Sequence, residues 1–312
     1  MTDICLMLEG QEDLTWERFF RFVDAAEQLG YDGLFRSDHL TSLDGNPRRE
    51  SLALWPSLTA LAQRTTRIRF GPMVCSITFR HPAILAKMAA SVDVLSSGRL
   101  DLGIGAGWNP HEHEMFGIPY PRYRDRLNHL DEGATVIEAL WSGHPRTTSG
   151  PQYPLIDAES HPSPVNTQPK LIMGGKGSQT LKVVAKHATE WNFSYDTLEF
   201  FVEKSAELDR ACDDIGRSPA EVTRSMMLPF AIGRNTADLQ THIDAHRAAF
   251  SGLPTNSVGW REAGFIVGTP DEVVDQIGQR REAGATRFML QQNALDDLKS
   301  VELVASEVIP QL

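Results

Sequence analysis

The chain has 312 residues, and its 41 Asp and Glu outnumber its 30 Lys and Arg, which gives a formal net charge of −11. With 41% hydrophobic residues it has the composition of an ordinary globular protein and is long enough to bury a large core. The acidic balance disfavours nucleic acid and anionic membranes as partners, because both attract basic surfaces. It leaves room for a small local basic site.

The N-terminal segment predicts no export signal. It contains no basic region before an apolar run, and Glu9 interrupts the run that is there. No stretch reaches the roughly 18 to 20 apolar residues of a membrane span. The three cysteines, Cys5, Cys75 and Cys212, are odd in number and widely spaced. This pattern indicates reduced thiols, a cytoplasmic location and no metal site.

Short apolar runs alternate with segments of helical periodicity along most of the chain. The expected strands are residues 4–8, 33–37, 67–74, 99–104, 170–173, 190–194, 222–232 and 286–291. The expected helices are residues 16–29, 52–63, 82–95, 123–141, 178–187, 198–215, 238–250, 270–283 and 295–308. Strands separated by helices pair in parallel. Eight strand–helix units in an α/β chain of this length favour a closed (β/α)8 barrel, the TIM barrel, over an open sheet.

Residues 142–168 interrupt this alternation. They are rich in Pro, Ser, Thr, Gly and His and show no helical period, which predicts an insertion between strands four and five. No linker or change of composition divides the chain, so we expect a single domain over residues 1–312.

Active sites of such barrels form at the C-terminal ends of the strands. The candidates there are Glu9; Ser37, Asp38 and His39; Val74, Cys75 and Ser76; Gly105–Trp108; Gly174–Gly177; Ser194 and Tyr195; and Gln291 and Gln292. Of these, His39 can exchange a proton near neutral pH, and Asp38 can accept hydrogen bonds from a ligand ring. The structural alternative is that Asp38 caps a loop and His39 is simply half-buried.

Two glycine-rich segments follow strands. Gly174–Ser178 joins a strand to a helix, so its backbone can approach an anion at the helix N-terminus, and Lys176 adds a positive charge. This favours a phosphate-binding loop, with a tight turn as the alternative. Gly103–Gly107 misses the dinucleotide fingerprint because Trp108 stands in place of the third glycine. Its small residues either leave room for a flat ligand or relieve backbone crowding.

Other motifs in the sequence give weaker support for a functional site. His111–Glu114 is not the H-E-x-x-H motif, and residues two apart face away from each other on a helix, so a metal site is disfavoured. Arg80 and His81 open a helix and face either an anionic ligand or solvent. The chain has no G-x-S-x-G or C-x-x-C motif, which leaves serine hydrolase and dithiol chemistry without support.

Several segments match a known family in order and spacing, nearly from end to end. They are residues 37–40 (SDHL), 66–74 (TRIRFGPMV), 79–82 (FRHP), 87–107 (KMAASVDVLSSGRLDLGIGAG), 108–121 (WNPHEHEMFGIPYP), 169–177 (PKLIMGGKG), 191–192 (WN) and 268–270 (GTP). They resemble the luciferase-like monooxygenase superfamily, and most of all its branch that uses the deazaflavin coenzyme F420.

The resemblance implies a TIM barrel with an insertion and a flavin-type ring in the barrel mouth. It implies that His39 is catalytic and that the peptide bond between Met73 and Val74 is cis. The cofactor-binding residues it implies are Asp38, Met73, Val74, Ala106, Gly107, Trp108, Gly174, Gly175, Lys176, Gly177 and Ser178. Trp108 stands where some sugar-phosphate-oxidising relatives have a carboxylate, which argues against that substrate.

The function that this resemblance implies is hydride transfer between the deazaflavin C5 and a small organic molecule. Two alternatives stay open, namely an FMN-dependent monooxygenase supplied with reduced flavin by a separate reductase, and a flavin-binding protein without activity. The resemblance also implies a homodimer. We expect a flat or hydrophobic substrate in a pocket lined by Leu8, Trp16, Trp108, Trp260 and the insertion.

Overall fold

The structure is a computed structural model that describes residues 2–166 and 169–312. Its strands are β1 (Asp3–Leu8), β2 (Gly33–Arg36), β3 (Arg69–Pro72), β4 (Cys75–Ser76), β5 (Leu102–Gly105), β6 (Arg146–Thr148), β7 (Leu155–Ala158), β8 (Leu171–Gly174), β9 (Glu190–Ser194), β10 (Thr223–Ile232), β11 (Ile266–Gly268) and β12 (Arg287–Gln292). Its α-helices are α1 (Trp16–Gln28), α2 (Leu54–Arg64), α3 (Pro82–Leu95), α4 (Pro110–Met115), α5 (Tyr123–Trp141), α6 (Ser178–His187), α7 (Leu198–Asp213), α8 (Thr236–Ala249), α9 (Ser257–Glu262), α10 (Pro270–Glu282) and α11 (Lys299–Glu307).

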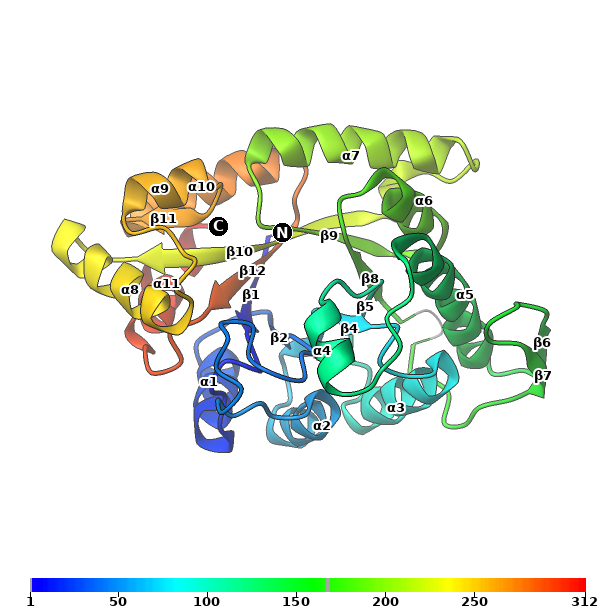
Figure 1. The fold of residues 1–312 in the computed structure, drawn as a ribbon. Coiled ribbons are helices and arrows are strands. Elements are labelled where there is room, and N and C mark those ends of the chain that lie inside the picture. The colour runs from blue at the N-terminus through cyan, green and yellow to red at the C-terminus, as the bar shows by residue number, and fades with distance from the viewer. Residues whose placement is uncertain (1, 167–168) are drawn as a thin grey trace.

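Parallel strands form a barrel, seen nearly end-on in Figure 1 with helices around its outside. The strand order is β3-β2-β1-β12-β10-β9-β8-β5-β4, and β11 extends the edge of β10. Strands β3 and β4 are consecutive pieces of one strand, interrupted at Met73 and Val74, so the ends of this path come together. Counting β3 and β4 as one strand leaves eight positions, which confirms the predicted TIM barrel.

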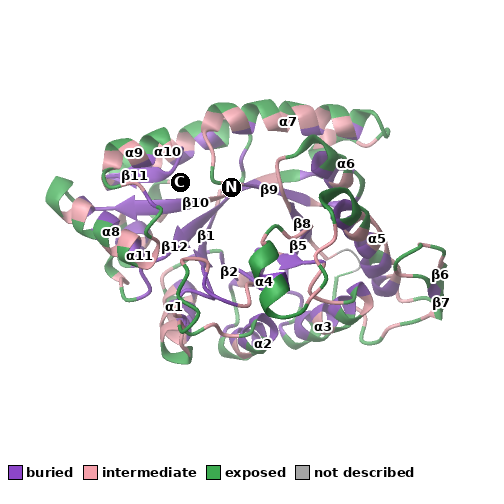
Figure 2. Ribbon diagram, in the orientation of Figure 1, coloured by how far each residue is buried: buried purple, intermediate pink, exposed green. Residues whose placement is uncertain are grey.

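Alternate residues of each strand face opposite sides of the barrel wall. In β1, Ile4, Leu6 and Leu8 belong to the large core between strands and helices, whereas Cys5 and Met7 belong to a smaller cluster inside the barrel. Figure 2 shows the barrel strands as mostly buried and the outer helix faces as exposed. Leu8 therefore faces the helices, and the expectation that it lines a pocket is wrong.

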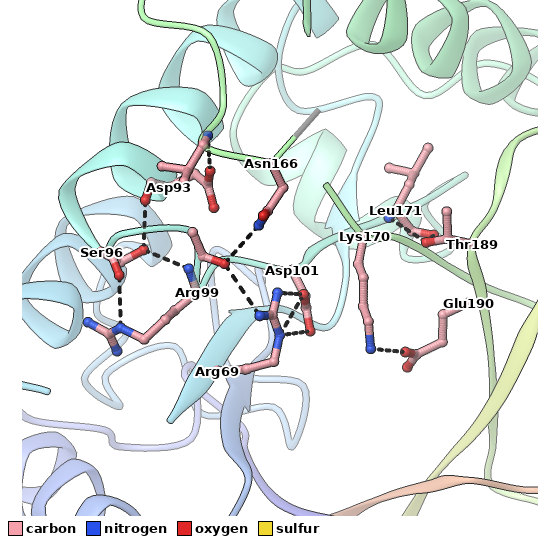
Figure 3. Close-up of polar contacts among 12 residues, drawn as sticks. Arg69, Asp93, Ser96, Arg99, Asp101, Asn166, Lys170, Leu171, Thr189 and Glu190 are labelled. Carbon is pink, nitrogen blue, oxygen red and sulfur yellow. Dashed lines mark hydrogen bonds and ion pairs between the residues drawn. The ribbon is translucent and has the colours of Figure 1, made fainter. Parts of the chain in front are cut away.

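Ion pairs close the N-terminal end of the barrel. Arg69 donates to both carboxylate oxygens of Asp101, and Lys170 lies 3.8 Å from Glu190 (Figure 3). The buried Arg287 links these groups, because its Nη1 lies 3.0 Å from Asp101 and 3.1 Å from Glu190. Removing one partner would leave a buried charge unpaired. This end of the barrel is therefore a structural closure, and ligand chemistry belongs at the other end.

The insertion forms an antiparallel hairpin of β6 and β7 at the periphery, beside α5 (Figure 1). It is tied to the end of α3 by the Val165 amide, which donates to Asp93 Oδ2 at 2.8 Å. Residues 142–166 contribute nothing to the cavity described below, so the expected pocket role of this part of the insertion is wrong, and residues 167–168 lie outside the described residues. The short elements β6, β7, α4, α9 and β11 were not predicted. No helix in the described part of the chain has the length and apolar character to cross a membrane.

Candidate active site

A cavity of ≈ 690 Å³ lies at the C-terminal ends of the barrel strands. Its wall contains the predicted residues Asp38, His39, Met73, Val74, Ala106, Gly107, Trp108, Gly174, Gly175, Lys176 and Gly177, together with Glu9, Leu43, Glu112, Tyr123, Tyr195, Met227 and Phe250. Ser178 is absent from the wall and lies on a separate depression beside Lys182 and Glu207. Trp16 and Trp260 also lie away from the cavity, contrary to expectation.

His39 follows β2 and is held by a carboxylate from the loop after β5. Its Nδ1 lies 2.8 Å from Glu112 Oε2, and the Leu40 amide donates to Glu112 Oε1 at 2.6 Å. The ionised Glu112 can only accept, so Nδ1 carries the proton and donates it. Nε2 has no protein partner among the described residues, which leaves it free to accept or donate a proton in the cavity.

Burial and the contact between His39 and Glu112 shift the pKa values of these two side chains in opposite directions. Burial of the imidazole disfavours its charged form, but the hydrogen bond and charge of Glu112 outweigh burial and raise the pKa of His39 above its ordinary value. Burial likewise disfavours the Glu112 carboxylate, yet its hydrogen bonds from His39 and Leu40 hold the pKa of Glu112 below its ordinary value. Glu112 was not predicted as a site residue, although its place in the loop that also carries Trp108 is a signal that could have identified it.

Asp38 is buried and forms a two-pronged ion pair with Arg80, the residue two before α3. Arg80 Nη2 donates to Asp38 Oδ1 at 2.9 Å, and Nη1 donates to Oδ2. Burial lowers the pKa of Arg80, but the Asp38 carboxylate more than compensates, so that pKa is raised. Arg80 is therefore occupied behind the wall rather than facing the cavity. Each Asp38 oxygen keeps a lone pair with which to accept from a ligand.

The peptide bond between Met73 and Val74 is cis, as the resemblance implies. The Val74 side chain packs against two glycines of β5, since a Cβ on Gly105 would lie 2.8 Å from Val74 Cγ2 and one on Gly103 would lie 3.0 Å from Cγ1. These glycines relieve crowding within the wall, which favours the structural reading of this segment. Trp108 is 64% exposed. Its ring packs edge-on against the His39 ring, with the two ring centres 5.6 Å apart.

The glycine-rich loop leads into α6 as predicted. Gly177 is the N-cap residue and offers no side chain to cap the helix, so the first-turn N–H groups remain available to a ligand. Gly175 has a φ of 122°, in the range that favours glycine. Lys176 lines the cavity, but its Nζ donates to Asp196 at 2.9 Å and lies 5.5 Å from the Phe193 ring centre. Its charge is thus already paired.

The strand-end residues Glu9, Tyr195 and Gln291, far apart in sequence, meet in one network. The Tyr195 hydroxyl donates to Gln291 Oε1, and Gln291 Nε2 donates to Glu9 Oε1. Gln11 Nε2 donates to the other Glu9 oxygen at 2.7 Å. Glu9 therefore receives two neutral amide donors and forms no ion pair within the described residues.

A TIM barrel with a cavity at this end defines a class of protein whose ligand site is built from the loops after the strands. This chain belongs to the luciferase-like monooxygenase family, whose model matches residues 4–287. The family assignment made from the sequence is confirmed.

Two relatives with named activities align with this chain over most of its length. A protein of Microbacterium testaceum named F420-dependent glucose-6-phosphate dehydrogenase is 28% identical over 92% of this chain and 90% of its own length. The F420-dependent hydroxymycolic acid dehydrogenase of Mycobacterium tuberculosis is 25% identical over 97% of this chain and 86% of its own. Among solved structures, an F420-dependent secondary alcohol dehydrogenase in complex with an F420-acetone adduct matches with a TM-score of 0.84 and 18% identity, covering 99% of this chain and 98% of the other. That similarity concerns the fold.

Proposed function

We propose that this protein is an oxidoreductase that uses coenzyme F420 to transfer a hydride to or from a small organic substrate. The observation that carries the proposal is the His39 imidazole, whose Nδ1 is fixed by Glu112 while Nε2 is free in the cavity wall. A histidine held in this way can exchange a proton with a substrate oxygen. The names of the two full-length relatives support F420 as the cofactor.

The residues present fit such a cofactor. The cavity volume of ≈ 690 Å³ is within the usual range for ligand sites. Met73, Val74 and Ala106 offer an apolar surface to a planar ring, and Asp38 offers acceptor oxygens to its polar edge. The uncapped start of α6 offers N–H donors to an anionic tail, with Lys176 beside it. Ser178 would contribute through its backbone, because its side chain lies outside the wall.

When bound, the deazaflavin accepts or releases two electrons as a hydride at C5. His39 Nε2 would take up the hydroxyl proton of an alcohol substrate, or supply it in the reverse direction. Glu112 keeps Nδ1 protonated, so Nε2 is the nitrogen that exchanges. Arg80 fixes the Asp38 carboxylate, and the loop over residues 174–178 positions the cofactor tail. A homodimer and a cytoplasmic location remain part of this proposal.

Cofactor titration tests the proposal. Purified protein should quench the fluorescence of F420 on binding and should bind FMN much more weakly. Tight FMN binding without F420 binding would overturn the proposal in favour of a monooxygenase served by a separate reductase. Replacing His39 by Ala should reduce turnover far more than F420 affinity, because its proposed role is proton transfer. Unchanged turnover would remove His39 from that role.

A further inference from the structure

A hydrogen-bonded relay leads from the cavity wall to a second histidine. The Ser76 hydroxyl, at the end of β4, lies 2.7 Å from the Thr78 hydroxyl, and Thr78 Oγ1 lies 2.7 Å from His113 Nε2. On the other side of the ring, His113 Nδ1 lies 2.7 Å from the Asn109 carbonyl oxygen. Ser76 and His113 border the cavity, and Thr78 joins them from outside the wall. The Ser76 oxygen is therefore linked to an imidazole that the proposed chemistry of His39 does not use.

The Asn109 carbonyl sets the direction of the hydrogen bonds in this relay. A carbonyl oxygen can only accept, so His113 Nδ1 carries a proton and donates it. In the neutral ring Nε2 is then bare and accepts from the Thr78 hydroxyl. Because Thr78 has used its one proton, its oxygen accepts from Ser76. The Ser76 proton is thereby committed to the relay, and toward the cavity the Ser76 oxygen can only accept.

The surroundings of His113 favour the neutral ring that this direction requires. The side chain is buried and packs against the rings of Phe79 and Tyr120, whose centres lie 4.9 Å and 4.7 Å from its own. Both of its nitrogens bond to uncharged groups, a hydroxyl and a carbonyl. The carboxylate of the neighbouring Glu112 bonds to His39 instead. A positive charge on His113 would thus be buried without an ion-pair partner of its own, which is unfavourable.

The wall leaves room around the two hydroxyls of the relay. A Cβ on Gly107 would collide with Ser76 Oγ and would lie 3.1 Å from Thr78 Oγ1, and the φ of Gly107, 76°, also favours glycine. Gly107 and Val74, which stands two residues before Ser76, both line the cavity and belong to the surface that we assign to the cofactor. The Ser76 oxygen therefore faces the place proposed for the cofactor ring.

Resting on the proposed function, we propose that Thr78 and His113 are positioning residues for the cofactor. They fix the Ser76 hydroxyl as an acceptor for an N–H or O–H group of F420. Because the relay orients this hydroxyl before binding, the cofactor meets an acceptor that does not have to turn. A carbonyl oxygen of a ligand in the same place would face a lone pair and would be disfavoured.

NMR of the full chain labelled with 15N-histidine tests the direction of the relay without any cofactor. The His113 signals, identified by their absence from the spectrum of His113→Phe, should show a protonated Nδ1 and a bare Nε2. A proton on Nε2 would reverse the hydrogen bonds through Thr78 and would overturn the proposal. This measurement does not depend on the proposed function.

Fluorescence titration with F420 tests the consequence for binding. Thr78→Val keeps the shape of the side chain but leaves the Ser76 proton without an acceptor, so F420 affinity should fall about twofold to tenfold. Thr78→Ser restores the hydroxyl and should restore the affinity. Thr135→Val is the matched control, because Thr135 lies on α5 and its partly buried hydroxyl donates to the Asp131 carbonyl at 3.1 Å. Equal affinity in T78V and T135V would overturn the proposal.

A double variant shows whether Thr78 acts through Ser76. Ser76→Ala removes the acceptor itself, so adding T78V to it should cause no further loss of F420 affinity. A further loss would mean that Thr78 acts by another route and would overturn the proposal. His113→Phe keeps an aromatic ring in place and should weaken binding as much as T78V does, which preserves the test if T78V does not fold.

The outcomes also separate this inference from the proposed function. If the native protein does not bind F420, the proposed function fails, and the assignment of the Ser76 acceptor to that cofactor fails with it. If the native protein binds F420 and neither T78V nor H113F weakens the binding, the positioning role alone is overturned.

Discussion

Nδ1 of His39 lies 2.8 Å from Oε2 of Glu112, although 73 residues separate them in the chain. One follows β2 and the other stands in the short helix α4, which lies over the barrel opening (Figure 1). The Glu112 side chain is almost fully buried, so it holds the histidine from within the protein and not from solvent. The contact fixes the tautomer of His39 and the direction of its free nitrogen.

Replacing Glu112 by Gln should therefore lower the pKa of His39. The carboxamide can still accept from Nδ1, but the negative charge that favours the imidazolium is gone. Since alcohol oxidation needs neutral His39, the rise of its rate with pH should move to lower pH in the variant, and reduction should lose activity earlier as pH rises. NMR titration of the ring checks the pKa without turnover. Identical titration in native protein and variant would contradict this account of the pair.

The pH dependence of the free energy of unfolding should also reveal the interaction between His39 and Glu112. Because the pKa of folded His39 is raised, its contribution is complete below the ordinary histidine pKa and is lost as pH rises through the raised value. The free energy of unfolding of the native protein should thus fall relative to E112Q across that interval. A difference between the two proteins that stays constant with pH would argue against charge coupling.

Adding a methyl group at Gly175 should weaken cofactor binding. Its φ of 122° strains any other residue, and a Cβ would lie 2.8 Å from Thr180 Cγ2. Strain of about 1 to 3 kcal/mol in the loop corresponds to roughly a fivefold to hundredfold loss of affinity. Gly216→Ala is the matched control, because that glycine also has a positive φ, of 73°, with nothing within 4 Å. Equal F420 affinity in G175A and G216A would exclude this loop from the cofactor site.

The barrel and much of the cavity wall could be predicted from the sequence, because apolar runs such as residues 4–8 and the glycines in residues 174–177 are local signals. It predicted one continuous strand over residues 67–74, whereas the cis peptide at Met73 and Val74 divides the strand within that range. Elements of three to six residues, such as β11 and α4, are too short to show a period. Contacts between distant loops, among them Glu112 with His39 and Asp38 with Arg80, depend on tertiary placement that no local pattern encodes.

Arg49 should contribute to both stability and substrate binding. It donates to the buried carboxylate of Glu12 and to the Ala249 carbonyl, and so links the loop that bears Leu43 to the one that bears Phe250. Arg49→Met removes both bonds and should lower the free energy of unfolding by about 1 to 3 kcal/mol. The KM for an apolar substrate should rise while F420 affinity stays the same. Urea denaturation measures the stability, and steady-state kinetics measures the KM. Arg48→Met is the control, because Arg48 is the exposed neighbour of Arg49. Equal stability and equal KM in the two variants would show that Arg49 does not connect the two loops.

His246 should make the fold sensitive to acid. The ring is fully buried between Phe230 and Trp260, and neither nitrogen has a hydrogen-bond partner within the described residues. Burial lowers the pKa of His246 to about 4. The unfolded chain binds a proton below about pH 6.5 while the folded protein resists it, so stability falls as pH decreases between these values.

His246 alone should lower the free energy of unfolding by about 2 kcal/mol as the pH falls from roughly 7 to 5. His246→Phe keeps an aromatic ring and removes the titration, so the variant should lose less stability over that interval than the native protein. Urea denaturation at both pH values gives the comparison, which does not depend on any constant packing difference. The exposed His144, replaced by Gln, controls for loss of a histidine as such. An equal loss of stability in H246F and the native protein would mean that the His246 pocket opens to water before the ring is protonated.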